Sequence, residues 1–529
     1  MDETLKSETI PEKPAPKAEK KEKQPVVWGK RDTIALIFGA ALSILWFRVY
    51  GFAAMLEGGP GLGVTLFQVL FLIGGSLCVK KGSPLTFSVK ILLGASLLLA
   101  LTCVLHSTYW LNLINAVISI ALGLMGLMIW SGRTRAMWDS FSAVTESFVL
   151  TLSGMFSHYF RPFSALTNRK PMGKKARGRF LGVVCGILAA GAMLIIVVPL
   201  LSSADEVFAD MTLGFMIKVK DFFDDMFSGQ SLAWIYKTLR FLLLALPLYS
   251  LLKSLGDGHR QPGEPMFRWF PRMEQAVIPA VVFLAALNVV YAVFVFIQFT
   301  YLFGNVEIAV MSGGFAEYAR SGFFQLVKVS ALNLGVLLLA ARILPTLKEG
   351  GRLPRYLAIV LIVFTAVILA SALYRMCLYV SVYSLSVKRF LTLWAMALIA
   401  VSLIATGVKL IRDDFPLYTT LFAAVLVFWI GLSAMNFEAR VANYNVDAYL
   451  EGKVETIDIA YLARSLSDSA VPALLDLEQA RGREGIDWDH YDSLVAEVTD
   501  MLAYRTPTWR SWTISTARAC ELMGVDRDA

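Results

Sequence analysis

A small set of polar side chains in an otherwise apolar chain is the strongest candidate for chemistry in this sequence. It begins in the segment GGFAEYARSGFFQLVK, which carries Glu317, Arg320 and Lys328 at the mouth of an apolar run. Glu317 and Arg320 lie three positions apart, so on a helix they share a face and can pair. A helix from Phe315 to Leu344 would be about 45 Å long. Its first turns would therefore project beyond a hydrocarbon core roughly 30 Å thick.

Other apolar segments carry polar groups at the same depth. Ser371, Arg375 and Tyr379 are spaced four apart, as are positions on one face of a helix. Charged groups at membrane depth are costly and normally face a bundle interior or a water-filled cavity. We therefore predict a polar cavity near one membrane surface. Its candidate lining residues are Asp205, Glu206, Gln298, Tyr301, Glu317, Arg320, Lys328, Arg375 and Tyr379.

Two interpretations of this polar cluster remain open. With Arg48 included, four bases near three acids would favour an anionic ligand in an outward-open cavity. Alternatively, the charges neutralise one another and pin helices together. The sequence does not choose between a ligand site and a structural network of ion pairs.

Motifs for catalysis, metals or cofactors are not found. The four histidines are scattered without HExxH spacing, and the five cysteines form no CxxC pair. GxSxG is missing, and no Asp or Glu lies deep in a predicted span. The glycines of GLGVTLF (61–67) open an apolar span with no strand before them, so they indicate helix packing rather than a nucleotide loop. We expect no enzyme, no cofactor and no bound metal.

The composition of the chain predicts the secondary-structure elements that position these residues. Hydrophobic residues make up 57% of the 529 and charged residues only 17%, and the mean hydropathy is +0.61. A span needs about 20 apolar residues, and in lipid the backbone must pair within its own segment, so apolar runs of this length are helices. We predict an all-α fold, a polytopic transmembrane helix bundle of about eleven spans. The predicted spans are 33–55, 61–79, 87–106, 111–130, 180–201, 235–254, 276–303, 326–344, 356–379, 390–411 and 416–435.

Three regions follow from this pattern. Residues 1–32 form a charged tail, rich in Lys, Glu and Pro, that we expect to be disordered. Residues 33–435 form the bundle. Residues 436–529 change character, with 17 acids against 9 Lys or Arg, and predict a small extramembrane cap of three or four short helices. The expected helices start near Glu438, after Thr456, after Ser467 or Asp468, and at Trp488.

The link 131–179 is basic and amphipathic. No acid occurs from Ser147 to Ala204, whereas seven Lys or Arg do. Phe141, Phe148 and Leu152 recur at helical spacing, with Ser142, Glu146 and Ser153 on the other side. This pattern predicts a helix in the plane of the inner headgroups and binding of anionic lipid, at about 1 kcal/mol per basic residue. A plain topology signal is the alternative.

Lys and Arg in alternate links predict the orientation, because they mark the cytoplasmic side. The Lys-rich N-terminal tail would lie inside, and the short links Leu56–Pro60 and Ser107–Trp110 would lie outside. Eleven spans place the acidic C-terminal region outside. The last two links are ambiguous, with Lys388 and Arg389 set against Lys409–Arg412. We expect a bacterial cytoplasmic membrane protein with the lipid bilayer as its main partner.

Several segments resemble a known group of bacterial membrane proteins. They are LLSSADEVFADM (200–211), QFTYLFGNVEIAVMSGGFAEYARSGFFQLVKVSALN (298–333), SALYRMCLYVSVYSLSVKR (371–389), NYNVDAYLEGKVETIDIAYLARSLSDSAVPALL (443–475) and TWRSWTISTARA (508–519). The chain resembles the multi-pass proteins grouped as domain of unknown function 4173, with 4153 as a related group. The resemblance implies a bacterial cytoplasmic membrane and supplies no activity.

Two functions are compatible with these features, and a membrane-embedded enzyme is a weaker third. The first is a transport or ligand-binding bundle with an outward-facing polar cavity; no inverted repeat of the kind common in transporters is evident. The second is a sensor or an envelope assembly or scaffold protein that acts through its extracytoplasmic cap and an envelope protein partner. The internal links hold no kinase, nucleotide-binding or DNA-binding motif, so we expect no nucleic-acid partner.

Overall fold

The computed structural model describes residues 28–49, 59–80, 83–134, 141–166, 206–226, 230–257, 277–304, 323–344, 352–482, 485–504 and 508–525, with isolated positions between 183 and 198. All regular elements in these ranges are helices, which confirms the predicted all-α fold. The chain divides into two compact units. One comprises residues 1–33 and 158–233, and the other comprises residues 34–157 and 234–529.

Nine of the described helices are long and apolar enough to cross a membrane, and a tenth, shorter apolar helix covers Leu62–Cys78. They correspond to ten of the eleven predicted spans, and the chain is therefore a membrane protein. The eleventh predicted span, 180–201, lies almost entirely outside the described residues. Residues 1–27, most of the tail that we predicted to be disordered, also lie outside the described residues.

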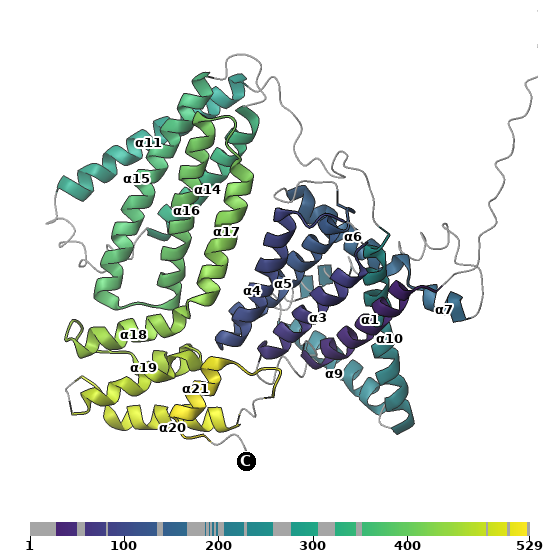
Figure 1. Cartoon of the computed structure of the whole chain (residues 1–529). Helices are drawn as coiled ribbons and strands as arrows, with labels where there is room; N and C mark the ends of the chain where they lie inside the picture. The colour runs from purple at the N-terminus through teal and green to yellow at the C-terminus, as the bar shows by residue number, and fades with distance from the viewer. Residues whose placement is uncertain are drawn as a thin grey trace, which may run out of the picture. The chain divides into compact units, whose positions relative to one another are not determined.

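The N-terminal half of the larger unit is a bundle of six helices (Figure 1). Glycines allow close packing there, since a Cβ at Gly75 would lie 2.4 Å from Leu127 and one at Gly74 would lie 2.6 Å from Phe38. Gln68 donates from α3 to Ser96 on α4 and to the Ser119 carbonyl on α5. The helices are α1 (Lys30–Val49), α3 (Leu62–Cys78), α4 (Phe87–Leu105), α5 (Tyr109–Trp130), α6 (Phe141–Ser157) and α10 (Gln230–Leu255).

The C-terminal half is a second bundle, in which α15, α16 and α17 lie side by side (Figure 1). Its buried core includes Leu337, Leu361 and Met396. Asn115 joins the halves: its Oδ1 accepts from Trp429 Nε1 at 2.8 Å and from Ser433 Oγ at 3.1 Å. The helices are α11 (Val277–Gly304), α14 (Phe323–Ile343), α15 (Arg352–Tyr383), α16 (Val387–Ile411) and α17 (Leu417–Ala434).

Residues 436–525 form the cap, a compact helical group that follows α17 (Figure 1). Four of its helical segments begin where the sequence predicts. α18 stops before Gly452, whose φ of 72° suits glycine. The sequence prediction omitted one helix of the cap, α21, which begins after Thr513. The cap consists of α18 (Phe437–Leu450), the turns Tyr461–Ser465, Asp468–Ala470 and Leu477–Ala480, α19 (Val471–Asp476), α20 (Trp488–Tyr504) and α21 (Ile514–Leu522).

The cap is attached to both halves of the bundle through main-chain groups. On the N-terminal half, Leu62 N donates to the Trp512 carbonyl and Gly63 N to the Arg510 carbonyl, at 3.1 and 3.0 Å. These first N–H groups of α3 have no partner within their own helix, so the cap supplies it. On the C-terminal half, the side-chain amide of Asn445 exchanges two hydrogen bonds of 2.8 Å with the main chain of Leu385.

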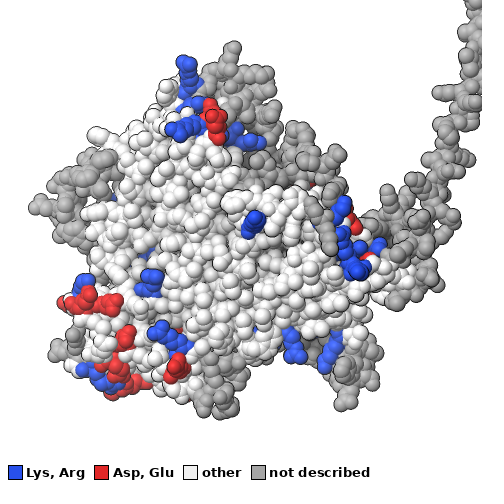
Figure 2. Space-filling view, in the orientation of Figure 1, with Lys and Arg blue, Asp and Glu red and all other residues white. Residues whose placement is uncertain are grey.

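The links that the structure describes fall at two ends of the bundle. The 59–60 and 107–110 links, both predicted to lie outside, line one cavity with cap residues. The ambiguous link at Lys388 and Arg389 also belongs to this end, because Val387 N donates to Tyr461 of the cap. At the other end of α15 and α16, Arg355 pairs with Asp413 at 3.0 Å. Figure 2 shows a largely uncharged face between charged groups near its upper edge and its lower left.

The predicted amphipathic helix is present as α6, but its polar side faces inward. Glu146 is fully buried and Ser147 is 4% exposed, whereas Phe148 is 65% exposed. Ser250 of α10 donates to the Gly154 carbonyl of α6 at 2.7 Å. Glu146 and Phe148 lie on opposite sides of α6, as the sequence predicts, but Glu146 packs on the bundle and Phe148 is left open. Residues 167–182 of the basic link lie outside the described residues.

The smaller unit contains α7 (Arg161–Leu166) and α9 (Glu206–Met226). Within it, Arg161 Nε donates to Asp32 Oδ1 at 2.7 Å, and Asp32 is only 1% exposed. Asp32 also accepts from Gly29 N at 3.0 Å, which satisfies an N–H just before the start of α1. This buried carboxylate is therefore both ion-paired and hydrogen-bonded, as burial requires.

Candidate functional site

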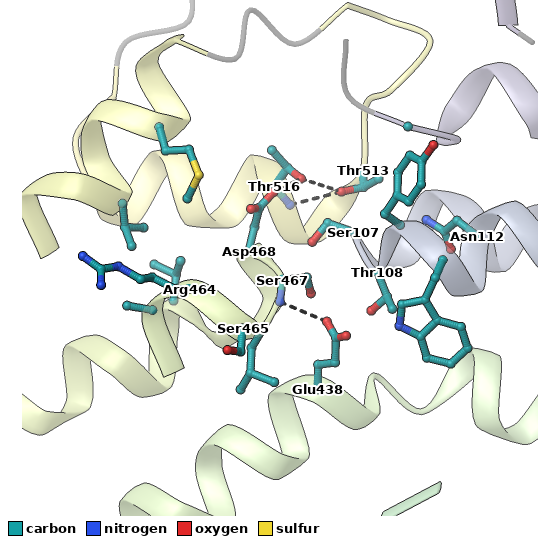
Figure 3. Close-up of a pocket in the computed structure, with 18 of the residues that line it drawn as sticks. Ser107, Thr108, Asn112, Glu438, Arg464, Ser465, Ser467, Asp468, Thr513 and Thr516 are labelled. Carbon is teal, nitrogen blue, oxygen red and sulfur yellow. Dashed lines mark hydrogen bonds between the residues drawn. The ribbon is translucent and has the colours of Figure 1, made fainter. Parts of the chain in front are cut away.

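A cavity of about 810 Å³ lies between the cap and two links of the N-terminal half. The bundle contributes Gly59, Pro60 and residues 107–110. The cap contributes α18, the turn 461–468 and the start of α21 (Figure 3). A cavity of this volume is in the range of small-molecule sites, roughly 300–1,000 Å³.

Glu438 is the most deeply buried ionisable group in the wall. It projects from the first turn of α18 and is 5% exposed. Its Oε2 accepts from Ser467 N at 3.0 Å. Figure 3 shows the carboxylate pointing into the space between Ser467 and Thr108. Within the described ranges, Glu438 has no ion pair with a Lys or Arg, and its Oε1 accepts no hydrogen bond.

A relay of hydroxyl groups holds the second carboxylate. Thr516 Oγ1 donates to Asp468 Oδ2 at 2.7 Å, and Thr513 Oγ1 donates to Thr516 Oγ1 at 2.9 Å. Thr513 also caps α21 by accepting from Thr516 N at 3.1 Å. Both hydroxyl groups of this relay donate in the direction of Asp468, whose Oδ2 accepts. The cap therefore presents Asp468 in a fixed position on the wall (Figure 3).

Three hydroxyl groups on the wall lack partners in the described part of the chain. Thr108 is 3% exposed, and its side chain does not cap α5, which it precedes. The Oγ atoms of Ser107 and Ser467 are buried and make no hydrogen bond within the described ranges. Buried polar groups are normally hydrogen-bonded, and each exception needs an explanation. All three hydroxyls line the same cavity as Glu438, and Figure 3 shows Ser467 and Thr108 on either side of its carboxylate.

One basic residue, Arg464, is found among the described residues that line the cavity. Its guanidinium forms a two-pronged pair with Glu497, with Nη2 to Oε2 at 2.6 Å and Nε to Oε1 at 3.1 Å. The hydrogen bond from Arg464 lowers the pKa of Glu497, so both groups are charged and compensate each other. Among the described residues no Lys or Arg pairs with Glu438, so the cavity wall carries the negative charge of this carboxylate without an ion-pair partner.

The rest of the wall is apolar on the cap side and aromatic on the bundle side. The apolar side chains are buried and belong to the cap's own core. Tyr109 and Trp110 are 48% and 36% exposed, and the Trp110 ring packs against Phe437 at 5.9 Å. The apolar lining residues are Leu462, Leu466, Val471, Leu474 and Val498.

His106 lies beside the cavity, where α4 ends. Its Nε2 is 3.0 Å from the Ala434 carbonyl at the end of α17. Burial lowers the pKa of His106, although the hydrogen bond to Ala434 and the charge of Glu438 act in the opposite direction. A neutral imidazole at this position ties the two halves together next to the cavity.

The nine residues of the predicted polar cavity are only partly described. Asp205, Glu317 and Arg320 lie outside the described residues, and so do the side chains of Glu206, Gln298 and Tyr301. Lys328 is exposed on α14, and Arg375 is 7% exposed on α15. Tyr379 is half-buried under the guanidinium of Arg389, at 4.1 Å. The predicted convergence of these nine residues stays a prediction.

Two polar side chains of α11, those of Asn288 and Tyr291, hold helices together. Asn288 donates to the Leu357 carbonyl at 2.9 Å, and Tyr291 donates to Asn333 at 2.8 Å. Asn333 in turn donates to Thr365 at 3.1 Å. These polar side chains therefore have a structural role between α11, α14 and α15.

The cavity of the cap was not predicted. Its two sides lie more than 300 residues apart in the sequence, and nothing in the composition of 107–110 relates it to 465–516. One local signal was available: TWRSWTISTARA contains Thr513 three positions before Thr516, which is the spacing of a helix N-cap. It would have added α21 but not the cavity.

Comparison with known proteins assigns the chain to a family but gives it no activity. A family model described as domain of unknown function DUF4153 matches residues 93–477. This confirms the resemblance to group 4153, while the narrower assignment to group 4173 stays a prediction. No curated protein and no solved structure matches.

Proposed function

The chain belongs to the DUF4153 family, and from that premise we propose that it is a ligand-binding membrane protein whose cap holds a small molecule against the bundle. The observation that carries the proposal is the cavity of about 810 Å³ lined by Glu438, Asp468 and unpartnered hydroxyls. Buried polar atoms left open are costly in an empty site and are satisfied by a bound polar ligand.

The attachment of the cap suggests what ligand binding achieves. The cavity wall is shared between the cap and the links of the N-terminal half, so a ligand would contact both. Because the cap also binds the α15–α16 turn through Asn445 and Tyr461, an occupied cavity would favour the docked arrangement of both halves. This supports a sensor that acts through its cap, the second of the two functions compatible with the sequence.

Transport is a second candidate, favoured by one observation. Arg375 is buried on α15, near the end of the bundle where the cap lies. A buried Arg in a membrane helix is a candidate for a substrate pathway. In this case the cap would cover the entrance to a pathway through the C-terminal half.

We further propose that the chain lies in a bacterial cytoplasmic membrane with its cap outside. The Lys-rich tail supports an internal N-terminus, and eleven spans then place the cap on the outer side. The exposed Phe148 of α6 and the basic residues that follow support contact with anionic lipid.

The cavity is tested by blocking it. Ser465 lines the cavity and is exposed, so Ser465→Trp should fill part of the space without disturbing the core. Ser493, exposed on α20 outside the cavity, gives the matched control Ser493→Trp. The full chain in lipid nanodiscs is screened against water-soluble cations, neutral compounds and anions by thermal unfolding. We expect compounds that stabilise the unmodified protein and the control, but not Ser465→Trp. A screen in which every stabilising compound acts equally on both variants would refute the proposal.

A further inference from the structure

We propose that the cavity under the cap binds a small organic cation, an ammonium or guanidinium group on an apolar body, with the Glu438 carboxylate as its counter-charge. The inference rests on the proposed function and specifies its ligand class. It follows from the charge, the open hydrogen-bonding groups and the size of the cavity.

Charge is the first argument. Glu438 is only 5% exposed, yet no Lys or Arg in the described ranges pairs with it. A single neutral donor, Ser467 N, contacts its Oε2. Buried carboxylates are normally paired, because leaving the charge alone in a low-dielectric site costs several kcal/mol. A cation bound in the cavity would provide the missing partner.

The open oxygens are the second argument. Glu438 Oε1 and the Thr108 hydroxyl face the same space, and Thr108 is 3% exposed without a hydrogen bond in the described part of the chain (Figure 3). The buried Oγ atoms of Ser107 and Ser467 are close by in the wall. Carboxylate and hydroxyl oxygens accept hydrogen bonds, and an ammonium group offers three donors and no acceptor. The carboxylate can only accept, and the hydroxyls can accept beside it, so the set fits a ligand rich in donors.

Size and lining are the third argument. A metal ion would occupy a small part of about 810 Å³, and no group of three His, Cys, Asp or Glu in the described residues could hold one. Leu466, Val471 and Leu474 offer an apolar wall to the body of a larger ligand. Tyr109 and Trp110 are aromatic faces at the other side, and such rings attract organic cations. The cavity therefore suits an amine with a hydrocarbon or aromatic body rather than a bare ion.

The experiment uses the full chain in lipid nanodiscs and four probes. Phenethylamine is the cationic probe, 2-phenylethanol the neutral one, 3-phenylpropanoate the anionic one, and magnesium chloride the inorganic one. Thermal unfolding is followed by tryptophan fluorescence. At saturating probe we expect phenethylamine to raise the unfolding temperature by about 3 °C or more, because it binds only the folded state. The other probes should leave it unchanged.

Two variants separate binding from partition into lipid. Glu438→Gln keeps the acceptor for Ser467 N and removes the charge, so the shift with phenethylamine should disappear. Asp500→Asn removes an exposed cap acid outside the cavity and should retain the shift. Thr108→Val removes the open hydroxyl and should weaken phenethylamine binding several-fold while the protein stays folded.

Each alternative result has a definite meaning. Equal shifts with phenethylamine in the unmodified protein and Glu438→Gln would overturn the cationic site. Stabilisation by the alcohol or the carboxylate that Ser465→Trp abolishes would also overturn it, yet would leave the ligand-binding cavity intact. Stabilisation by magnesium as large as that by phenethylamine would replace the organic ligand with an inorganic ion. If none of the probes shifts the unmodified protein, the cationic site is refuted.

Discussion

Docking of the cap depends on Gly61, which allows two main chains to approach. A Cβ at this position would lie 2.6 Å from the Trp512 carbonyl oxygen and 2.7 Å from the Ser511 carbonyl carbon. Such distances are shorter than side-chain carbons adopt, and main-chain atoms cannot rotate away. Gly61→Ala should therefore separate the 510–512 segment of the cap from the start of α3.

The size of the effect follows from the contacts that the separation breaks. Leu62 N and Gly63 N would lose their acceptors on the cap. At about 1 kcal/mol for each hydrogen bond, docking of the cap loses about 2 kcal/mol. Since 1.4 kcal/mol is a factor of ten, the undocked fraction should rise about thirty-fold.

The undocked fraction of the cap can be measured by the rate at which trypsin cleaves one peptide bond. The Arg510 carbonyl that accepts from Gly63 belongs to the Arg510–Ser511 peptide bond, so docking shields the bond that trypsin cleaves. When opening is fast relative to cleavage, the rate follows the population of the open form. The released fragment, which begins at Ser511, is quantified by mass spectrometry. We expect cleavage of Gly61→Ala to be about thirty-fold faster than that of the unmodified protein.

Gly94 provides the matched control. It lies in the middle of α4, and a Cβ there would have no atom within 4 Å. Gly94→Ala should leave cleavage after Arg510 unchanged, because alanine favours the helix and meets no neighbour. Equal cleavage rates for Gly61→Ala and Gly94→Ala would show that the close approach of α3 and the cap does not hold the cap in place.

Two further predictions concern the junction of the halves and the surface of the cap. Asn115→Leu removes three interhelical hydrogen bonds, one of them from Trp429, and at about 0.6 kcal/mol each should destabilise the bundle by about 2 kcal/mol; an unchanged midpoint of unfolding in dodecyl sulfate would contradict this. Arg481 lowers the pKa of Glu478 and of Asp492 through hydrogen bonds. Lowered carboxyl pKa values add stability above about pH 4 that is lost as the pH falls through them. Arg481→Gln should therefore flatten the fall of the cap's unfolding temperature between pH 5 and pH 3, and equal slopes in the two proteins would refute this role.

The length and apolar character of the spans were predictable because the lipid core imposes them. Ten of the predicted runs coincide with described helices, and α20 begins at the predicted Trp488. Near the membrane the same logic fails for α6. Its periodicity shows two faces, but the sequence does not state whether the apolar face meets protein or lipid. In the structure Glu146 is buried against the bundle and Phe148 is exposed.

The cap-side cavity could not be predicted because it depends on contacts distant in the sequence. Its carboxylates come from residues 438 and 468, and its open hydroxyl comes from residue 108. Each is unremarkable in its own segment: Thr108 precedes a helix, and Asp468 lies in a Ser-rich turn where a helix start is expected. Their chemistry exists only when the cap docks, and docking is set by main-chain contacts at Gly61 and Leu385.

The same contacts determine how an occupied cavity could act on the bundle. α18 follows α17 directly, so the cap moves with the C-terminal half, and the bonds to Asn445 and Tyr461 reinforce this link. Its hold on the N-terminal half has no such chain connection and consists of non-covalent contacts only. Those described are the main-chain hydrogen bonds at Leu62 and Gly63, Ser515 donating to the Leu105 carbonyl, and Arg510 donating to the Arg48 carbonyl at 3.0 Å. A ligand that bridges Glu438 of the cap and Thr108 of the N-terminal half would strengthen the second of the two attachments. Cleavage after Arg510 should therefore slow when phenethylamine binds, and it should slow in the unmodified protein but not in Glu438→Gln.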